Sequence, residues 1–238
     1  MKSKFLLFIL IFTFSSATYA QMFSVGGDSG QQARSSSNYF RIGYSPVTFE
    51  YDGNTSNPTQ DRLDFESPAL TFFFETPAIS ASLSFVNGLT GAEDERYLNL
   101  SIDYLNRLSF VKSRTFEFGI PFGLNSNLVN VQNEQMNDDF SQTVFAFGLG
   151  GFAAVRVPDK ISFALEGIPS YGFSNSRGGL FGGSNKSLLF RARLNFLNII
   201  SERNLSLGYD YKFSSYDLDA DEFDYDLTYH RITLGISL

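Results

Sequence analysis

Seven charged side chains stand at the polar positions of stretches in which every second residue is apolar. They are Asp103, Glu117, Glu166, Arg191, Arg193, Asp210 and Lys212. Residues two apart share one face of a β-strand, so each stretch would present its charges on one face. Opposite charges on neighbouring strands can pair. The sequence therefore predicts a network of structural ion pairs, in which the two arginines lie between Glu166 and Asp210.

His230 is the only histidine of the chain, and any imidazole chemistry depends on it. Asp224 and Asp226 are the acidic residues that lie nearest before it in the sequence. Asp226 precedes His230 by four residues, about 13 Å along an extended strand, which is beyond hydrogen-bond reach. No cofactor-binding motif accompanies it. We therefore expect a protein without enzymatic activity and without a cofactor.

The most acidic segment of the chain runs from residue 217 to residue 226. It begins with the D-x-D-x-D pattern of a calcium-binding loop, formed by Asp217, Asp219 and Asp221. Glu222 and Thr228 replace the glycine and the glutamate that an EF-hand places at its sixth and twelfth positions, so an EF-hand is excluded. Two interpretations stay open. The three aspartates are candidate ligands of a hard divalent cation, or the segment is a solvated, charged loop.

The alternation of polar and apolar residues recurs along most of the chain and predicts β-strands. The expected strands cover residues 39–51, 62–75, 78–86, 98–104, 116–122, 141–157, 160–170, 188–196, 205–214 and 231–238. The first of them changes phase around Pro46, which predicts a β-bulge or an irregular edge. Residues 70–74 are apolar on both faces and leave their register open. The count is ten, with eight and twelve as alternatives, because pattern alone sets boundaries poorly.

The segments between these strands fall into two groups. Mostly short segments follow the even-numbered strands, and long polar segments follow the odd-numbered strands, at residues 52–61, 87–96, 125–140, 171–186 and 215–223. Transmembrane barrels of the bacterial outer membrane have long loops outside the cell and short turns in the periplasm. A soluble β-sandwich, the alternative fold, gives no reason for this sorting. We therefore expect an all-β, antiparallel, up-and-down transmembrane β-barrel whose polar strand faces line the lumen.

The N-terminal residues have the layout of a secretory signal peptide. Lys2 and Lys4 precede an apolar run from Phe5 to Phe14, and small residues up to Ala20 provide a cleavage site. The run is shorter than the roughly 20 residues that a membrane-spanning helix needs. The absence of cysteine excludes a lipid anchor and disulfide bonds. The expected parts of the chain are a signal peptide, a flexible segment and a barrel, at residues 1–20, 21–38 and 39–238.

Together these features resemble the small outer-membrane β-barrel proteins of diderm bacteria. The resemblance rests on the signal peptide, the alternating strands, the sorted loops and the alternating C-terminal stretch, and no diagnostic motif accompanies it. In such proteins the last strand is the signal that the barrel-assembly machinery reads, and residues 229–238 look like that strand. Many members end in phenylalanine, whereas this chain ends in Leu238. The resemblance implies a location in the bacterial outer membrane, with lipid and lipopolysaccharide around the barrel.

A barrel of about ten strands has a lumen only slightly wider than one that side chains fill. We therefore expect a largely occluded lumen and a non-catalytic structural component or accessory subunit of an envelope complex, with other envelope proteins as partners. A small-solute, porin-like channel is the second hypothesis. An outer-membrane hydrolase is the third, and it depends on His230. The formal net charge of −7 argues against nucleic acid as a partner.

Overall fold

A computed structural model of the protein shows a β-barrel. It describes residues 38–53, 63–87, 90, 95–133, 138–158, 160–176, 182–200, 202–218 and 224–238. The expected signal peptide, residues 21–37 of the expected flexible segment, and two of the candidate cation ligands, Asp219 and Asp221, lie outside the described residues.

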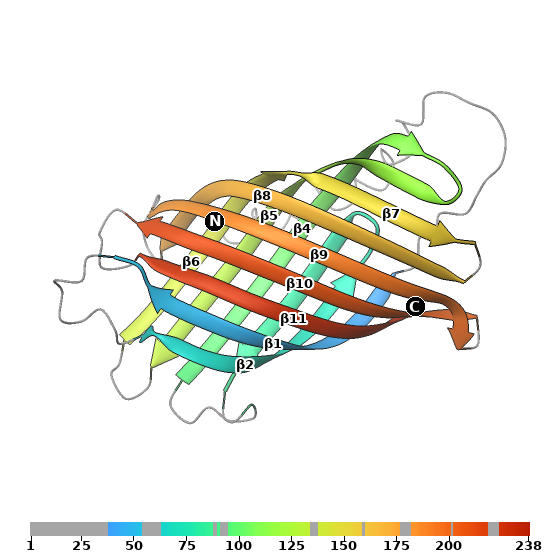
Figure 1. The fold of residues 1–238 in the computed structure, drawn as a ribbon. Helices are drawn as coiled ribbons and strands as arrows, with labels where there is room; N and C mark the ends of the chain where they lie inside the picture. The colour runs from blue at the N-terminus through green and yellow to red at the C-terminus, as the bar shows by residue number, and fades with distance from the viewer. Residues whose placement is uncertain are drawn as a thin grey trace, which may run out of the picture. The chain divides into compact units, whose positions relative to one another are not determined.

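The strands pair in antiparallel fashion into one closed sheet. Their bounds are β1 Tyr39–Tyr51, β2 Phe65–Glu75, β3 Ile79–Val86, β4 Glu95–Lys112, β5 Phe116–Asn133, β6 Asp138–Leu149, β7 Gly151–Val157, β8 Ile161–Ser176, β9 Gly183–Ile200, β10 Arg203–Leu218 and β11 Tyr225–Ser237. Strands that follow one another in the chain pair, except for β6 and β7, and β1 pairs with β11, which closes the barrel. Figure 1 shows these first and last strands side by side. The expected all-β, up-and-down barrel is confirmed.

Strands β6 and β7 together form one position in the barrel wall. Both pair with β5 and with β8, and the register on each side is the same before and after Gly150. Pro121 on β5 and Pro169 on β8 lie on the flanking strands at this point and lack the backbone N–H that a ladder needs. The amide of Gly150 still donates to the carbonyl oxygen of Pro121 at 3.0 Å, a distance typical of a strand ladder. The barrel is therefore ten-stranded, with one wall strand recorded in two pieces.

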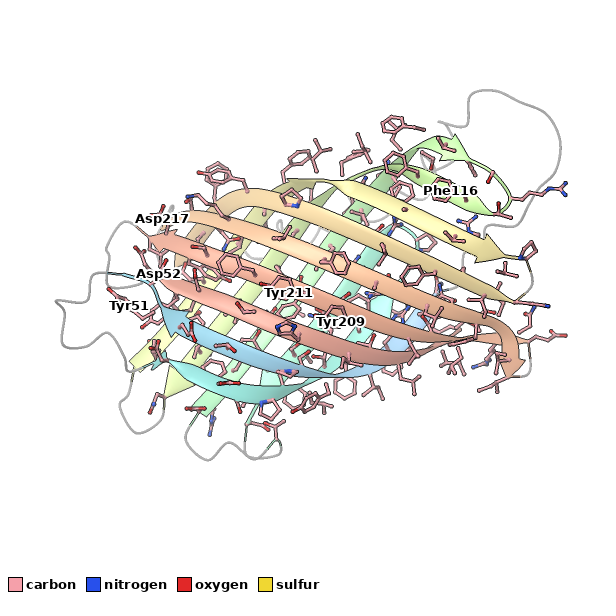
Figure 2. All side chains as sticks on the ribbon, viewed as in Figure 1. Tyr51, Asp52, Phe116, Tyr209, Tyr211 and Asp217 are labelled. Atoms are coloured by element: carbon pink, nitrogen blue, oxygen red, sulfur yellow. The ribbon has the colours of Figure 1, made fainter. Side chains whose placement is uncertain are left out.

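The two ends of the barrel differ in their connections. The end that we call the loop end carries residues 52–64, 87–94, 134–137, 177–182 and 219–224 between strands. The opposite, turn end carries residues 76–78, 113–115, 158–160 and 201–202. Figure 2 shows Tyr51, Asp52 and Asp217 at the loop end and Phe116 at the turn end.

The inner and outer faces of the wall exchange their chemistry toward the loop end. From Tyr39 to Ser45 the exposed residues of β1 are apolar, and the buried ones include an arginine and a serine. Beyond this point Val47 and Phe49 are fully buried in the interior. Glu50, the outward residue that follows them, is exposed. An outer surface that changes from apolar to charged marks the level at which the wall leaves the membrane.

The same exchange occurs on strands from other parts of the wall. On β5 the inner residues change from asparagine at Asn127 to valine at Val129 and Val131. The outer residues change over the same stretch from Leu124, which is exposed, to Asn130. The barrel therefore continues beyond the membrane, and there its apolar side chains point inward.

This exchange corrects the expected bulge at Pro46. The register of β1 with β2 runs without a shift from Tyr39 to Phe49. Its register with β11 keeps the same offset at Tyr44 and at Val47, on both sides of the proline. The strand geometry is thus continuous, and only the chemistry of the two faces changes.

The long loops expected from the sequence are shorter in the structure. β5 runs to Asn133, β8 to Ser176 and β10 to Leu218, and β9 begins at Gly183, so the expected loops 125–140, 171–186 and 215–223 are wrong in extent. The ends of β5, β9 and β10 carry polar side chains on their outer face, because that face meets water, and so they resemble loops in sequence. On β8 the outward Tyr171 and Phe173 are exposed and aromatic. β4 likewise extends to Lys112, through most of the stretch expected to hold a turn.

The open register of residues 70–74 is settled by burial. Thr71 and Phe73 point into the lumen and are 0% and 2% exposed. Leu70, Phe72 and Phe74 lie on the outer face. A phenylalanine ring is thereby placed inside the polar half of the barrel.

A methyl group at position 150 should weaken the barrel, whereas one at position 151 should not. A Cβ atom on Gly150 would overlap the carbonyl oxygen of Gly167, but a Cβ atom on Gly151 would meet nothing within 4 Å. We expect Gly150→Ala to lower the free energy of unfolding by about 1–3 kcal/mol, the usual cost of forced overpacking. Urea unfolding in detergent micelles measures it, with Gly151→Ala as the matched control. Equal losses in the two variants would contradict this reading of the wall.

Candidate functional site: a filled lumen

Charged side chains from opposite sides of the barrel wall meet in the membrane-embedded half of the lumen. We call this set the charged belt, and its members are Arg41, Glu75, Asp103, Arg107, Glu166, Arg191, Arg193, Asp210, Lys212 and Arg231. They come from strands β1, β2, β4, β8, β9, β10 and β11. Each occupies an inward position of its strand, so the strand alternation aims them at a common centre.

Asp210 is the centre of the belt. Its carboxylate accepts a hydrogen bond from Arg193 Nη1 at 2.6 Å. Arg191 Nε lies 3.6 Å and Arg231 Nη1 lies 3.7 Å from its two oxygens. The Asp210 side chain is 2% exposed. One buried carboxylate is thus shared by three guanidinium groups at short range.

Glu75 joins walls that are not adjacent in the sheet. Its Oε2 lies 2.9 Å from Arg41 Nε on the neighbouring strand β1 and 3.1 Å from Arg193 Nε on β9. Three strands, β1, β11 and β10, separate β2 from β9 in the sheet order. The second ion pair therefore spans the interior instead of following the wall.

Further ion pairs cross the lumen from β4. Arg191 Nη2 lies 3.5 Å from Asp103 Oδ2, and Arg107 Nε bonds to Glu166 Oε1 on β8. Glu166 Oε2 also faces Arg191 Nη1 at 3.8 Å. Together with the pairs at Glu75 and Asp210, these contacts connect the two walls across the lumen.

Phe73 provides a hydrophobic face for the arginines. The guanidinium carbons of Arg191, Arg193 and Arg231 lie 6.0, 5.5 and 5.4 Å from the centre of its ring. Cations within about 6 Å of an aromatic face are attracted to the ring electrons. The ring therefore helps to hold three like charges side by side.

The structure brings together most, but not all, of the charged residues singled out from the sequence. Asp103, Glu166, Arg191, Arg193, Asp210 and Lys212 lie in the charged belt. Glu117 does not, because it lies near the turn end, where it pairs with Arg156 Nη2 at 2.7 Å and accepts a bond from Ser109 Oγ at 2.5 Å. Asp103 and Glu117 are on adjacent strands but far apart in register, since Asp103 faces Asn125.

Sequence reasoning missed four members of the belt, Arg41, Glu75, Arg107 and Arg231. Glu75 ends a strand and Arg107 lies in a stretch expected to turn, so neither stood in an alternating run. Arg41 and Arg231 did alternate with apolar neighbours, and that signal could have found them. Across the belt, the cations outnumber the carboxylates by two, as Arg41, Arg107, Arg191, Arg193, Arg231 and Lys212 face Glu75, Asp103, Glu166 and Asp210.

An apolar plug fills the lumen between the charged belt and the loop end. Its aromatic centre is Phe140, whose ring lies 5.0 Å from Phe49, 5.4 Å from Tyr216 and 5.2 Å from Tyr225. The remaining buried members of the same cluster are Val47, Leu63, Phe65, Ala69, Val86, Tyr97, Val129, Val131, Val144, Ala146, Leu218, Leu227 and Tyr229. A lumen that is polar throughout, as the sequence suggested, is therefore wrong for this end of the barrel.

His230 faces outward, away from the lumen. Its Nδ1 lies 2.9 Å from the hydroxyl oxygen of Tyr209, and its ring centre lies 5.0 Å from that of Tyr211. Figure 2 shows both tyrosines between the two barrel ends, on the wall that faces the viewer. Asp226 lies four residues away on the same strand. The histidine thus belongs to an aromatic group on the outer surface, where amphipathic rings are common in membrane barrels.

The candidate cation ligands are only partly described. Asp217 is an exposed residue near the end of β10, and its two candidate co-ligands lie outside the described residues. Within the described part of the chain, no group of three or more acidic, histidine or cysteine side chains is placed to hold a metal ion.

A small cavity remains beside the charged belt. Its volume is about 30 Å³, and Asp103, Asn125, Ser170, Ser187, Arg191 and Lys212 supply its polar lining. Gly148 also lines it, where a larger side chain would take up the space. A cavity of this size holds a few water-sized particles at most.

The outer surface determines the environment of the barrel. Exposed apolar residues from all eleven strands surround the barrel on the side of the turn end. A closed sheet has no unpaired strand edge, so its backbone tolerates a hydrocarbon surrounding. This is an outer-membrane β-barrel. By the general layout of such proteins, we expect its loop end to face the exterior of the cell and its turn end to face the periplasm. The described residues include no helix of the length and hydrophobicity needed to cross a bilayer.

Comparison with known proteins finds similar architecture. No protein-family model matches the chain, and no curated protein matches it. The outer-membrane protease OmpT from Escherichia coli is 9% identical, with a TM-score of 0.44 over 85% of this chain and 97% of that chain. Neisserial surface protein A is 9% identical, with a TM-score of 0.34 and coverages of 84% and 96%. The attachment invasion locus protein Ail of Yersinia pestis is 15% identical, with a TM-score of 0.27 and coverages of 84% and 97%. Such likeness concerns architecture and says nothing about activity.

Removal of the central carboxylate should destabilise the outer-membrane barrel strongly. Asp210→Asn leaves Arg191, Arg193 and Arg231 without their shared counter-charge, and breaking a buried ion pair on one side costs about 3–5 kcal/mol. Urea unfolding in detergent micelles measures this loss.

Two further variants show whether charge is the cause. Asp226→Asn removes a carboxylate on the outer face, where Asp226 stands opposite Glu50, and should change stability by less than about 1 kcal/mol. The double variant Arg193→Met/Asp210→Leu removes one charge of each sign and should recover part of the loss, although Arg231 still lacks its only carboxylate partner among the described residues. A double variant as unstable as Asp210→Asn would show that the ion pair itself is not what stabilises the lumen.

Proposed function

We propose that this outer-membrane barrel is closed and non-catalytic, and that it acts as a structural component or accessory subunit of an envelope complex. The filled lumen carries the proposal. A barrel whose interior is occupied from wall to wall offers no continuous path for a solute, so its interactions with other molecules take place on its outside.

Two barriers in series support a closed lumen. The ion pairs of Glu75 with Arg193 and of Asp103 with Arg191 cross the membrane-embedded half. Beyond them, the rings around Phe140 occupy the part of the lumen that lies above the membrane. A permeating ion would have to break charged contacts first and then enter an apolar region, which is unfavourable for a charge.

The position of His230 supports a non-catalytic role. Acid–base catalysis needs a base within hydrogen-bond reach of an orienting group and of a substrate. His230 is bonded to Tyr209 on the outer face, at a level where lipid surrounds the wall. The arginines and carboxylates of the belt form ion pairs with one another inside the lumen.

The outside of the barrel offers two surfaces to partners. One is the apolar band, which meets lipid and could meet the transmembrane part of another envelope protein. The other is the wall beyond the membrane, where outward residues such as Glu50 and Asp139 are exposed and charged, at the depth of lipopolysaccharide head groups. We assign insertion to the barrel-assembly machinery, which would read β11, the strand that closes the barrel.

Planar-bilayer recording tests the closed lumen. We expect the purified, folded protein to insert without conductance steps, because the charged belt and the apolar plug block the path. Folding is verified first by the heat-dependent shift in electrophoretic mobility that folded barrels show. Steady conductance in the wild-type protein, with an ion selectivity that changes in Arg193→Gln, would overturn the proposal in favour of a small-solute channel.

Extraction of the native protein in mild detergent tests the accessory role. We expect mass spectrometry to find another envelope protein in stoichiometric amount, because a barrel with a filled lumen would act through contacts on its outside. Cells that lack the gene provide the control for unspecific membrane proteins. A barrel that is recovered alone at every detergent concentration would argue against an accessory subunit.

A further inference from the structure

We infer that the cavity beside the charged belt is a binding site for a small monatomic anion of the chloride type, with Lys212 as its principal ligand. The inference concerns the interior of the barrel and is independent of any partner on its outside.

Lys212 is a buried cation that forms no salt bridge within the described part of the chain. Its side chain points into the lumen from β10, and the residue is 7% exposed. Among the described residues, no carboxylate lies within ion-pair distance of it, whereas each arginine of the belt has at least one. An unpaired charge in an interior is strongly unfavourable unless another group or ion neutralises it.

The carboxylate nearest to this site is already occupied. Asp103 Oδ2 accepts a bond from Ser80 Oγ at 3.0 Å and faces Arg191 Nη2 at 3.5 Å. Its Oδ1 accepts a bond from Asn125 Nδ2 at 2.5 Å. Lys212 therefore shares the cavity with a carboxylate whose oxygens are committed to other donors.

The cavity is lined by further donors, one of which is unsatisfied. The buried Nε atom of Arg191 has no hydrogen-bond partner within the described structure, although it faces Asp210 at 3.6 Å. Ser170 and Ser187 stand opposite one another across β8 and β9 and add two hydroxyl groups to the lining. Ammonium, guanidinium and hydroxyl groups are all donors, and together they suit an anion.

The size and the charge of the site select the class of ligand. A volume of about 30 Å³ admits one or two water-sized particles, which suits a single small ion. The belt carries two more cations than carboxylates, so a bound monovalent anion halves the excess. A water molecule would fill the space but would leave the charge of Lys212 unbalanced.

Halide-dependent stability tests the site. The barrel is refolded from urea into detergent micelles in sodium chloride, sodium bromide or sodium gluconate of equal ionic strength, and its thermal unfolding midpoint is measured. We expect a higher midpoint in both halides than in gluconate, because only the folded state offers the site and gluconate is too large for it. Equal midpoints in the three salts would overturn the inference.

Three variants locate the effect. Lys212→Met removes the charge at similar length and should abolish the difference between halide and gluconate. Ser187→Val fills the cavity and retains every charge, and it should abolish the difference as well. Lys186→Met removes an exposed lysine at the adjacent position of β9 and should keep the difference unchanged. A halide effect that survives Lys212→Met or Ser187→Val, or that disappears in Lys186→Met, would overturn the inference.

Bromide in crystals gives an independent readout. Crystals grown in sodium bromide should show an anomalous scattering peak between Lys212 and Arg191 in the wild-type protein and none there in Lys212→Met. A wild-type crystal without a peak in the cavity would show that water alone occupies it and would overturn the inference.

Discussion

The medium outside each part of the wall decides what the inside must contain. Where lipid surrounds the barrel, the outward positions are apolar, so the polar side chains of the same strands can only point inward. Where the wall rises into water, the outward positions turn polar, and Val47, Phe49 and Val129 move the apolar surface to the inside. The charged belt and the apolar plug are therefore two results of one rule. Each strand turns its apolar face toward lipid where lipid surrounds the barrel, and toward the lumen where water surrounds it.

The charged belt is stable only because its charges are shared. A single buried ion pair seldom repays the loss of hydration of its two members. Here Asp210 faces three guanidinium groups, Glu75 faces two, and the ring of Phe73 lies beside three of the same arginines. A lumen of ten strands is narrow enough for side chains from opposite walls to meet. The pairs that cross from β2 and β4 to β9 thus fill the lumen and link its walls at once.

Local pattern predicted the strands and the inward position of most belt residues, because both follow from the alternation of side chains, and the sorting of long and short connections predicted the barrel. It also placed Arg191 correctly between its neighbours, since the residue stands opposite Glu166 on β8 and Asp210 on β10. The contacts of Glu75 and Arg107 were not predictable in this way. They depend on which strands face one another across the closed barrel, and a linear pattern carries no such information. The ends of β5, β9 and β10 near the loops were missed because their polar outer residues resemble loop residues.

The specific charges also settle a choice that alternation leaves open. A strand that slips by two residues keeps every apolar side chain on the outside, so the lipid-facing pattern alone does not fix the register. A slip of β9 against its neighbours by two residues would put Arg193, instead of Arg191, opposite both Glu166 and Asp210 and would move Arg191 toward the plug. The bonds of Arg193 to Glu75 and Asp210 and of Arg191 to Asp103 would then be lost together. The belt therefore selects one register among those that the membrane accepts, and a barrel with fewer charges in its lumen would fill the same space with a less defined structure.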